Sequence, residues 1–351
     1  MATSMHPAHP EHFYPRRFLS SGHAMTIAGN YLRRPDYLPA PECVLIEAAP
    51  AADGAIATQL LCLCHWQPQE VRAARPTVIL LHGLEGSSNS QYVIGNANKV
   101  WAAGGNVIRM NMRNCGGTEH LSATLYHSGF ASDVITVLRH FIAAQQLQSV
   151  AIVGYSMGGN LVLRAAGDLG PNAPPQLRSI VGISPAVDMA LSADLLHAPQ
   201  NRVYEWKFLR SLVARYRRKC ALFPDRFDLA RSRGIRSLRE FDGRIIAHFY
   251  GYRDADDYYH SASAMRAIDR IAVPTYILHA DDDPFIVISQ ESRRHIEANR
   301  NITYVQTPHG GHCAFLAHPA PGYDGYWAEH ELLRFILDHA GVNDHAGVNG
   351  C

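Results

Sequence analysis

Short runs of apolar and β-branched residues recur along the chain and predict its strands. They lie at 43–48, 59–66, 77–83, 106–113, 149–156, 179–185, 274–280 and 302–308. The turn signal Asp53-Gly54 separates the first two runs and predicts that they pair antiparallel. The later runs are almost continuously apolar, a pattern typical of strands that are covered on both faces.

Between these runs lie stretches in which apolar residues follow helical spacing. We expect helices at 91–103, 129–147, 156–169, 286–299 and 325–340, with Gly170-Pro171 ending the third. Because strands and helices alternate, the sequence predicts an α/β fold with a mostly parallel central sheet flanked by helices. We assign this core to residues 43–187 and 266–340.

Residues 188–265 break the alternation. They contain no buried-strand run but carry Arg, Phe, Tyr and Leu at roughly helical spacing, which predicts a helical cap or lid inserted into the core. The basic cluster "RYRRK" at 215–219 has two interpretations, a solvated helix face or a contact with an anionic substrate or lipid headgroup.

The two ends of the chain differ from the core in composition. Residues 1–42 are rich in Pro and Arg, and we expect an arm that lies over the domain or is partly loose. The tail, 341–351, completes a repeated "HAGVN" and is expected to be flexible.

Composition narrows the class of protein. A chain of 351 residues with 47% hydrophobic residues can form a large core, and its net charge of +1 predicts no nucleic-acid partner. Seven scattered cysteines indicate neither a disulfide framework nor a zinc ribbon, and Cys62 and Cys64 are expected to pack on one strand face.

The sequence also bears on location. The N-terminus lacks the apolar region of a secretory signal, and no apolar run approaches the roughly 18 residues of a membrane span. We therefore expect a reduced, soluble, cytoplasmic protein. Peripheral membrane contact and the oligomeric state remain open at this point.

The chemistry begins with "GYSMG" at 154–158, which has the form G-x-S-x-G between a strand and a helix. In that context the motif predicts a sharp turn that lifts a nucleophilic Ser156 above the sheet. The glycines are needed because strand and helix pass too close together there for a Cβ.

A serine nucleophile needs a base, and the base needs an orienting carboxylate. In this fold the order along the chain is Ser, acid, His. "ILHADDDPF" (277–285) supplies three aspartates and "TPHGGHCAF" (307–315) supplies His309 and His312. A metal site is disfavoured because three adjacent carboxylates cannot all face one ion, so we expect neither metal nor organic cofactor. A solvated turn is the simpler alternative, which the order of the three segments argues against.

An oxyanion hole requires two N–H donors. We expect the backbone N–H of Met157, directly after the serine, and that of Leu84 in "HGLEGSS" (82–88). His82 precedes this loop and is expected to support it by hydrogen bonding.

These motifs resemble the α/β-hydrolase superfamily and, within it, the YheT-like branch with its plant embryogenesis-associated hydrolases and animal abhydrolase-domain lipases. The resemblance covers residues 80–315 and rests on "LLHGLEGSSNSQY" (80–92), "MNMRNCGGTEHL" (110–121), "GYSMGGNLVL" (154–163), "ISPAVD" (183–188), "VPTYILHADDDPF" (273–285) and "HGGHCAF" (309–315).

The resemblance implies site residues. It places the nucleophile at Ser156, the acid at Asp283 immediately before proline, and the base at His312, the second histidine of H-G-G-H. The other two aspartates, Asp281 and Asp282, remain fallback acids.

Two further features follow from the matching stretches. Arg113 and Asn114 line the pocket or support it, and we favour support. "GHAMT" (22–26) departs from the "HLQT" of the family, so a role of the N-terminal arm is open.

The resemblance also implies an activity, hydrolysis of carboxylic esters such as short-chain esters or monoacylglycerol-like lipids, with a small-molecule or lipid ester as substrate. An acyltransferase using the same Ser-Asp-His triad, or a non-catalytic binding protein on a hydrolase fold, are the alternatives.

Overall fold

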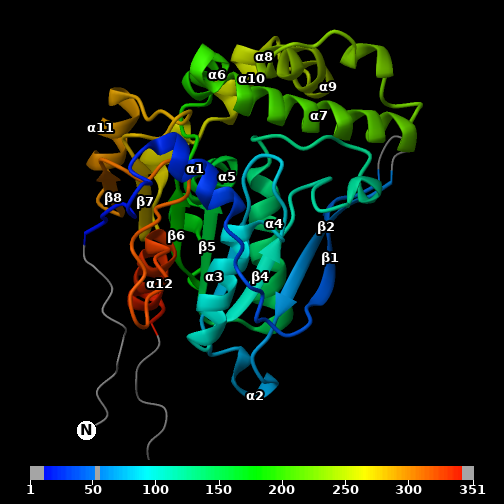
Figure 1. Ribbon diagram of the computed structural model, residues 1–351. Coiled ribbons are helices and arrows are strands. Elements are labelled where there is room, and N and C mark those ends of the chain that lie inside the picture. Colours follow the sequence, from blue (N-terminus) through cyan, green and yellow to red (C-terminus); the bar gives the residue numbers. More distant parts are fainter. Residues whose placement is uncertain (1–11, 52–55, 342–351) are drawn as a thin grey trace, which may run out of the picture.

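The computed structural model describes residues 12–51 and 56–341 and contains one eight-stranded sheet (Figure 1). Its strands are β1 (Glu42–Ala49), β2 (Thr58–His65), β3 (Thr77–Leu81), β4 (Asn106–Met110), β5 (Val150–Tyr155), β6 (Leu177–Ile183), β7 (Thr275–Ala280) and β8 (Ile302–Thr307). They are arranged in the order β1-β2-β4-β3-β5-β6-β7-β8. β2 pairs antiparallel with both β1 and β4, and the remaining pairs are parallel. The predicted fold class is confirmed.

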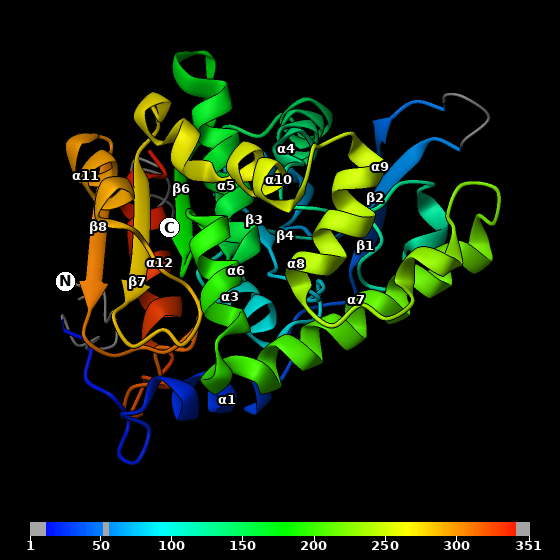
Figure 2. The same cartoon turned by 90° about the horizontal axis from the view of Figure 1, so that it is seen from above.

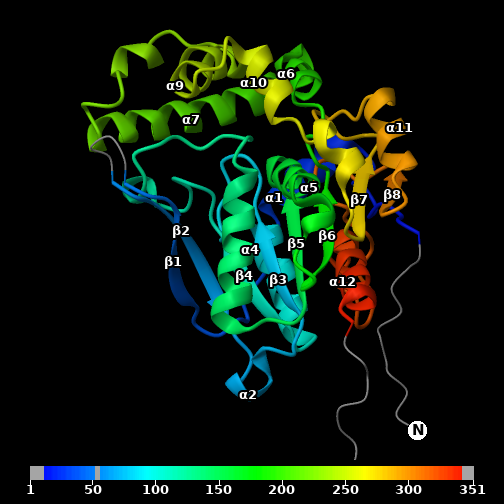
Figure 3. The same cartoon turned by 180° about the vertical axis from the view of Figure 1, so that it is seen from behind.

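Helices cover both faces of the sheet (Figures 1 and 3). One face packs on α3 (Gln91–Ala102) and α12 (Trp327–His339), and the other on α4 (Ala131–Gln145), α5 (Met157–Leu169) and α11 (Gln290–Ala298). Alternate residues of β3 enter the two cores, Ile79 on one side and Val78 and Leu80 on the other. Because both faces are buried, the strand has no polar side, which is why its sequence is continuously apolar.

The segment 188–265 is mostly helical, contains no strand and lies over the carboxyl ends of the strands (Figure 2). It contains α6 (Met189–His197), α7 (Arg202–Leu222), α8 (Leu238–Phe241), a π-helical turn at Asp242–Ala247, α9 (His248–Tyr250) and α10 (Ala255–Ala262). We call it the inserted segment. Its role as a substrate-selecting cap stays a prediction.

Part of the basic cluster at 215–219 is buried, whereas the first interpretation of its sequence was a solvated helix face. Lys219 is fully buried, and its amine donates to Asn114 Oδ1 (3.1 Å) and to the carbonyls of Glu119 and Ser122. Burial lowers the pKa of Lys219 to about 7. Arg215 is also buried, so the interpretation is wrong for these two residues. They fasten α7 to the core.

The N-terminal segment contains a helix that the sequence did not reveal, α1 (Gly22–Tyr31). Its hydrophobic pattern is weak, and only Met25 enters a core, against Ala314 and Leu316. A buried ion pair between Arg34 and Glu329 of α12 (3.0 Å) holds the segment down. From residue 12 onward, the segment therefore packs against the core, and its assignment as a separate arm stays a prediction.

Several sequence-based expectations fall on residues that the structure does not describe: residues 1–11, the turn at Asp53-Gly54 and the tail from 342 onward. Cys62 and Cys64 are both buried in the same core, as expected. Within 12–51 and 56–341, no helix is long and apolar enough to cross a bilayer.

The close approach of α5 to the 3-10 helix at Ala264–Arg270 yields a stability prediction. A Cβ added to Gly167 would lie 2.2 Å from the carbonyl oxygen of Ala267, so the two elements would have to separate. We expect Gly167→Ala to lower the free energy of unfolding by about 1–3 kcal/mol, although alanine favours helix. Urea unfolding measures this. Gly243→Ala is the control, because its Cβ would meet nothing closer than 3.8 Å. Equal stability of both variants would contradict the packing described.

Candidate active site

Ser156 occupies a strained turn between β5 and α5. Its φ of 56° and ψ of −119° are unfavourable for any residue with a side chain. The turn is held by hydrogen bonds: the Ser156 N–H donates to the Ile183 carbonyl (2.9 Å), and the Ser156 carbonyl accepts from Asn160 N–H (3.0 Å). A Cβ at Gly154 or Gly158 would lie 2.2–2.3 Å from backbone oxygens. Only glycine therefore fits at positions 154 and 158.

Two loops at the carboxyl ends of β7 and β8 bring Asp283 and His312 together. His312 Nδ1 lies 2.8 Å from Asp283 Oδ2, and the carboxylate requires that this nitrogen carry the proton and donate. The other oxygen, Oδ1, accepts from the N–H groups of Phe285 (3.1 Å) and Ile286 (2.9 Å). When the imidazole is neutral, Nε2 is therefore its unprotonated nitrogen.

The electrostatics of the pair favour its charged form. Burial by itself would raise the pKa of Asp283 and lower that of His312. The mutual attraction of carboxylate and imidazolium outweighs burial, so the pKa of Asp283 is lowered and that of His312 is raised. A cation forming on His312 would therefore be stabilised.

The two fallback aspartates have other contacts. Asp282 accepts from the Gly311 N–H (2.8 Å) and lies 3.2 Å from His309 Nδ1. Asp281 accepts from the Gln306 side chain. Asp282 and His309 therefore support the loop around His312, and Asp281 contacts β8, whereas Asp283 is the aspartate that contacts the His312 ring.

Cys313 connects the histidine loop to the serine turn, a role that the sequence did not suggest. The Ile183 carbonyl, which accepts from Ser156 N–H, also lies 3.8 Å from Cys313 Sγ. The same sulfur is 3.6 Å from His312 Nε2. The backbone of Cys313 is left-handed, at φ 62°, and donates to Ser184 Oγ (3.1 Å). Cys313 Sγ thus lies between the His312 ring and the Ile183 carbonyl that holds the serine turn.

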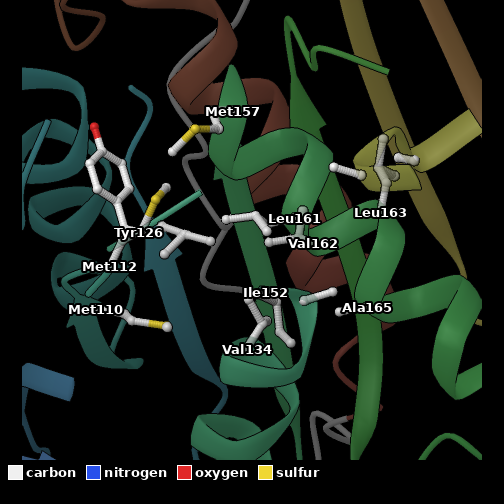
Figure 4. Close-up of a cluster of buried hydrophobic side chains, with 14 of the residues drawn as sticks. Met110, Met112, Tyr126, Val134, Ile152, Met157, Leu161, Val162, Leu163 and Ala165 are labelled. Carbon is white, nitrogen blue, oxygen red and sulfur yellow. The ribbon is translucent and has the colours of Figure 1, made fainter. Parts of the chain in front are cut away.

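The expected oxyanion donors flank the serine. Leu84, Ser156 and Met157 line one cavity, and Gly83 lets the Leu84 loop approach, since its Cβ would lie 3.0 Å from Ser156 Cβ. Met157 is the first residue of α5, where N–H groups have no intrahelical acceptor. Figure 4 shows Met157 at the head of α5, with its side chain near Met112 and Tyr126.

His82 supports the Leu84 loop as expected. Met112 N–H donates to its Nε2 (3.2 Å), so Nδ1 carries the proton and donates to the Gly83 carbonyl (2.8 Å). Burial lowers the pKa of His82 to about 4, which keeps this tautomer neutral. Both ring nitrogens are occupied, and the residue is not placed to exchange protons with substrate.

The residues after β4 have structural contacts. Arg113 makes two 2.6 Å hydrogen bonds to the buried Asp133 carboxylate. Asn114 accepts from Lys219 and donates to the Thr124 carbonyl. These contacts agree with the structural interpretation of both residues.

A further residue that the sequence did not single out, Glu85, ties the inserted segment to the oxyanion loop. It follows Leu84 with a left-handed φ of 57°. Its buried carboxylate accepts from Tyr126 OH (2.5 Å), from Ser211 Oγ and from Arg215 Nε (3.0 Å). Ser211 and Arg215 belong to α7, so this helix helps to fix the position of Leu84. An acid inside "HGLEGSS" opposite a run of arginines is the signal that sequence analysis could have used.

The cavity beside Ser156 is mainly apolar. The inserted segment contributes most of its wall, including Met189, Leu196, Phe208, Leu212, Leu238, Phe241 and Ile246. Phe285, also on the wall, contacts the His312 ring at a centroid distance of 4.3 Å. Among the described residues that line the cavity, Asp242 is the one carboxyl. Burial raises the pKa of Asp242 to about 7, and Tyr259 OH donates to its carboxylate (2.7 Å). An apolar chain fits this wall, with the reacting group at Ser156.

Comparisons with known proteins agree with this architecture. The family model for the alpha/beta hydrolase fold matches residues 76–319. The chain is 35% identical to YheT of Escherichia coli, an esterase by its name, over 72% of this chain and 74% of that protein. It is 30% identical to phospholipase ABHD3 of Bos taurus, over 76% of this chain and 65% of that protein.

Other relatives are more distant. Monoacylglycerol lipase of Saccharomyces cerevisiae is 24% identical, over 75% of this chain and 59% of that protein, so the chain spans less than two thirds of these eukaryotic relatives. Among solved structures, the Pyrococcus furiosus esterase Pf2001 has a TM-score of 0.55 at 13% identity, covering 86% of this chain and 93% of that one. The 2,6-dihydroxy-pseudo-oxynicotine hydrolase has a TM-score of 0.56 at 17% identity, covering 91% and 72%. These structures share the fold.

The Glu85–Arg215 contact predicts a large loss of stability when it is broken. Glu85→Ala would leave Arg215 buried without its main carboxylate, and we expect a loss of about 3 kcal/mol in the free energy of unfolding. Asp168→Ala, which breaks a partly exposed pair with Arg164, should cost less than about 1 kcal/mol. Denaturant unfolding of both variants tests this, and similar losses would show that Glu85 does not fasten α7.

Proposed function

We propose that this chain, which belongs to the α/β-hydrolase fold family, is a serine hydrolase that cleaves carboxylic esters. One observation carries the proposal. Asp283 orients the His312 ring through Nδ1, and Cys313 links the histidine loop to the strained Ser156 turn, which lies on the wall of an apolar cavity. The names of the relatives, an esterase, a phospholipase and a monoacylglycerol lipase, support esters as the substrate class.

The reaction begins when His312 Nε2 takes the proton of Ser156 as its oxygen attacks the ester carbonyl. Asp283 keeps Nδ1 protonated and stabilises the imidazolium that forms. The N–H groups of Leu84 and Met157 stabilise the negative charge on the carbonyl oxygen, and loss of one such donor typically costs about 3 kcal/mol. His312 then protonates the departing alcohol, leaving an acyl group on Ser156.

Water completes the cycle. With the alcohol gone, His312 again has a neutral Nε2 and takes a proton from a water molecule that attacks the acyl-enzyme. The tetrahedral intermediate collapses, Ser156 regains its proton from His312, and the carboxylic acid leaves. This sequence uses only side chains and backbone of the chain.

The cavity wall bears on the substrate. Phe208, Leu212 and Phe241 of the inserted segment offer apolar surface to an acyl chain or to the alcohol of a monoacylglycerol-like lipid. We propose that this segment acts as a cap and sets the chain length. A cytoplasmic location stays a prediction.

Removal of the nucleophile tests the proposal. With p-nitrophenyl esters from acetyl to palmitoyl, we expect Ser156→Ala to lower kcat/KM by at least about a thousandfold. The control variant Ser192→Ala alters another serine on the cavity wall, and its kcat/KM should stay within a few fold of the wild-type value. The acyl length with the highest kcat/KM reports the size of the cavity.

Other results would identify the alternatives. An acyltransferase would label Ser156 with a fluorophosphonate but form product only when an acceptor alcohol is added. Equal inactivity of wild type and Ser156→Ala, without labelling, would favour a binding protein and sink the hydrolase proposal.

The Asp283–His312 pair predicts the pH dependence. The base must be neutral, so kcat/KM should fall as the pH drops through the pKa of His312, which Asp283 raises above its ordinary value. Asp283→Asn removes the stabilising anion, so the acid limb should move to lower pH while the rate drops by about a thousandfold or more. Asp281→Asn should leave both the acid limb of the pH profile and the rate nearly unchanged. A larger effect of Asp281→Asn than of Asp283→Asn would reassign the acid.

A further inference from the structure

The outer face of α7 is cationic and apolar, and the helix has no acid there. α7 carries seven basic residues, Arg202, Lys207, Arg210, Arg215, Arg217, Arg218 and Lys219, and a single acid. That acid, Glu205, is buried and accepts from His197 and from the Leu238 N–H. The exposed positions follow helical spacing: Arg202, Val203, Trp206, Lys207, Arg210, Ala214, Arg217, Arg218, Ala221 and Leu222. In a protein with a net charge of only +1, this is a strong local asymmetry.

α1 extends this face. Figure 2 shows α1 beside the first half of α7, and the His23 ring stacks on Tyr204 at 5.7 Å. Lys207 Nζ lies 5.1 Å from the centre of the Tyr31 ring. α1 has no charged residue, and its exposed side chains include Ile27 and Tyr31. We call the exposed residues Ile27, Tyr31, Val203, Trp206, Lys207 and Arg210 the α1–α7 face.

We propose that the α1–α7 face docks the protein onto a lipid surface that contains anionic headgroups. Trp206 is 60% exposed, Val203 76% and Tyr31 67%, although water is a poor environment for each. Aromatic and aliphatic side chains interleaved with Lys and Arg suit the headgroup boundary, where the apolar groups enter the acyl region and the cations remain at the phosphates.

The combination of cationic and aliphatic side chains on this face favours a membrane over a nucleic acid. Lys207 and Arg210 complement any polyanion. Val203 and Ile27, however, are aliphatic and offer no ring for a base to stack on, whereas at a lipid surface they are removed from water. The docked partner is therefore expected to be both anionic and apolar, which describes a bilayer surface.

The face lies next to the cavity. Phe208 and Leu212 on the inner side of α7 line the cavity beside Ser156, while Lys207 and Arg210 are exposed on the outer side. Docking would bring a lipid surface within about one helix diameter, roughly 10 Å, of that cavity. The proposal extends the proposed function but does not depend on catalysis, since binding needs neither Ser156 nor His312.

Vesicle co-sedimentation of the full chain tests the proposal. We expect binding to vesicles of phosphatidylcholine with one third phosphatidylglycerol, weakened by salt, and little binding to phosphatidylcholine alone. Lys207→Gln/Arg210→Gln should weaken it by about tenfold or more. Val203→Ser/Trp206→Ser should remove the part that persists in salt. The matched control, Arg139→Gln/Arg294→Gln, removes two exposed cations from α4 and α11 and should bind like wild type.

Four results would overturn the proposal. The first two are absence of binding to the anionic vesicles and equal weakening of that binding by the control variant. The third is binding of a short RNA through the same residues without vesicle binding. The fourth is a change of oligomeric state in the Val203→Ser/Trp206→Ser variant, which would mark the face as a subunit interface. Hydrolysis of a soluble short-chain ester, measured on every variant, separates this proposal from the proposed function. Unchanged hydrolysis with lost vesicle binding supports docking, and vesicle binding by an inactive wild type would leave docking standing alone.

Discussion

The backbone conformation of Ser156 is the constraint on which the site depends. A residue with a side chain is held at positive φ because β5 and α5 approach closely enough that Gly154 and Gly158 admit no Cβ. The cost of such a conformation, about 1–3 kcal/mol, is offset by the surrounding packing and hydrogen bonds. Since Ile183 accepts from both Ser156 and the Cys313 thiol, the same turn also locates the histidine loop. The contacts that hold the strained serine turn thus also hold the histidine loop.

α7 connects the cavity wall, the Leu84 loop and the 114–122 loop. Its inner side lines the cavity through Phe208 and Leu212, and its buried cations, Arg215 and Lys219, contact the core. Arg215 holds Glu85 next to Leu84, and Lys219 donates to three oxygens of the 114–122 loop. These contacts involve desolvated charges, so they are specific in geometry and costly to break. The inserted segment is therefore attached to the core by ion pairs as well as by apolar packing.

Most of the sheet could be predicted from the sequence because buried strands leave a continuous apolar signal, as in β3 and β5. The serine turn was equally readable, since a strained strand–helix junction requires glycines at fixed offsets. The choice of Asp283 over Asp281 and Asp282 came from family resemblance, and spacing alone left all three open. The roles of α1, Glu85 and Cys313 could not be predicted from the sequence, because these roles arise from contacts between segments far apart in the chain. The burial of Arg215 and Lys219 depends on carbonyls and carboxylates that no local pattern reveals.

The contact between Thr26 and the histidine loop has a consequence for biosynthesis. Thr26 Oγ1 accepts from the His312 N–H (2.8 Å), so the first helix supports a loop encoded near the other end of the chain. Arg34 and Glu329 join the same two regions. Domains usually begin to fold while the ribosome is still translating. Here α1 cannot complete these contacts until residues 312 and 329 have emerged, and His312 follows Thr26 by 286 residues.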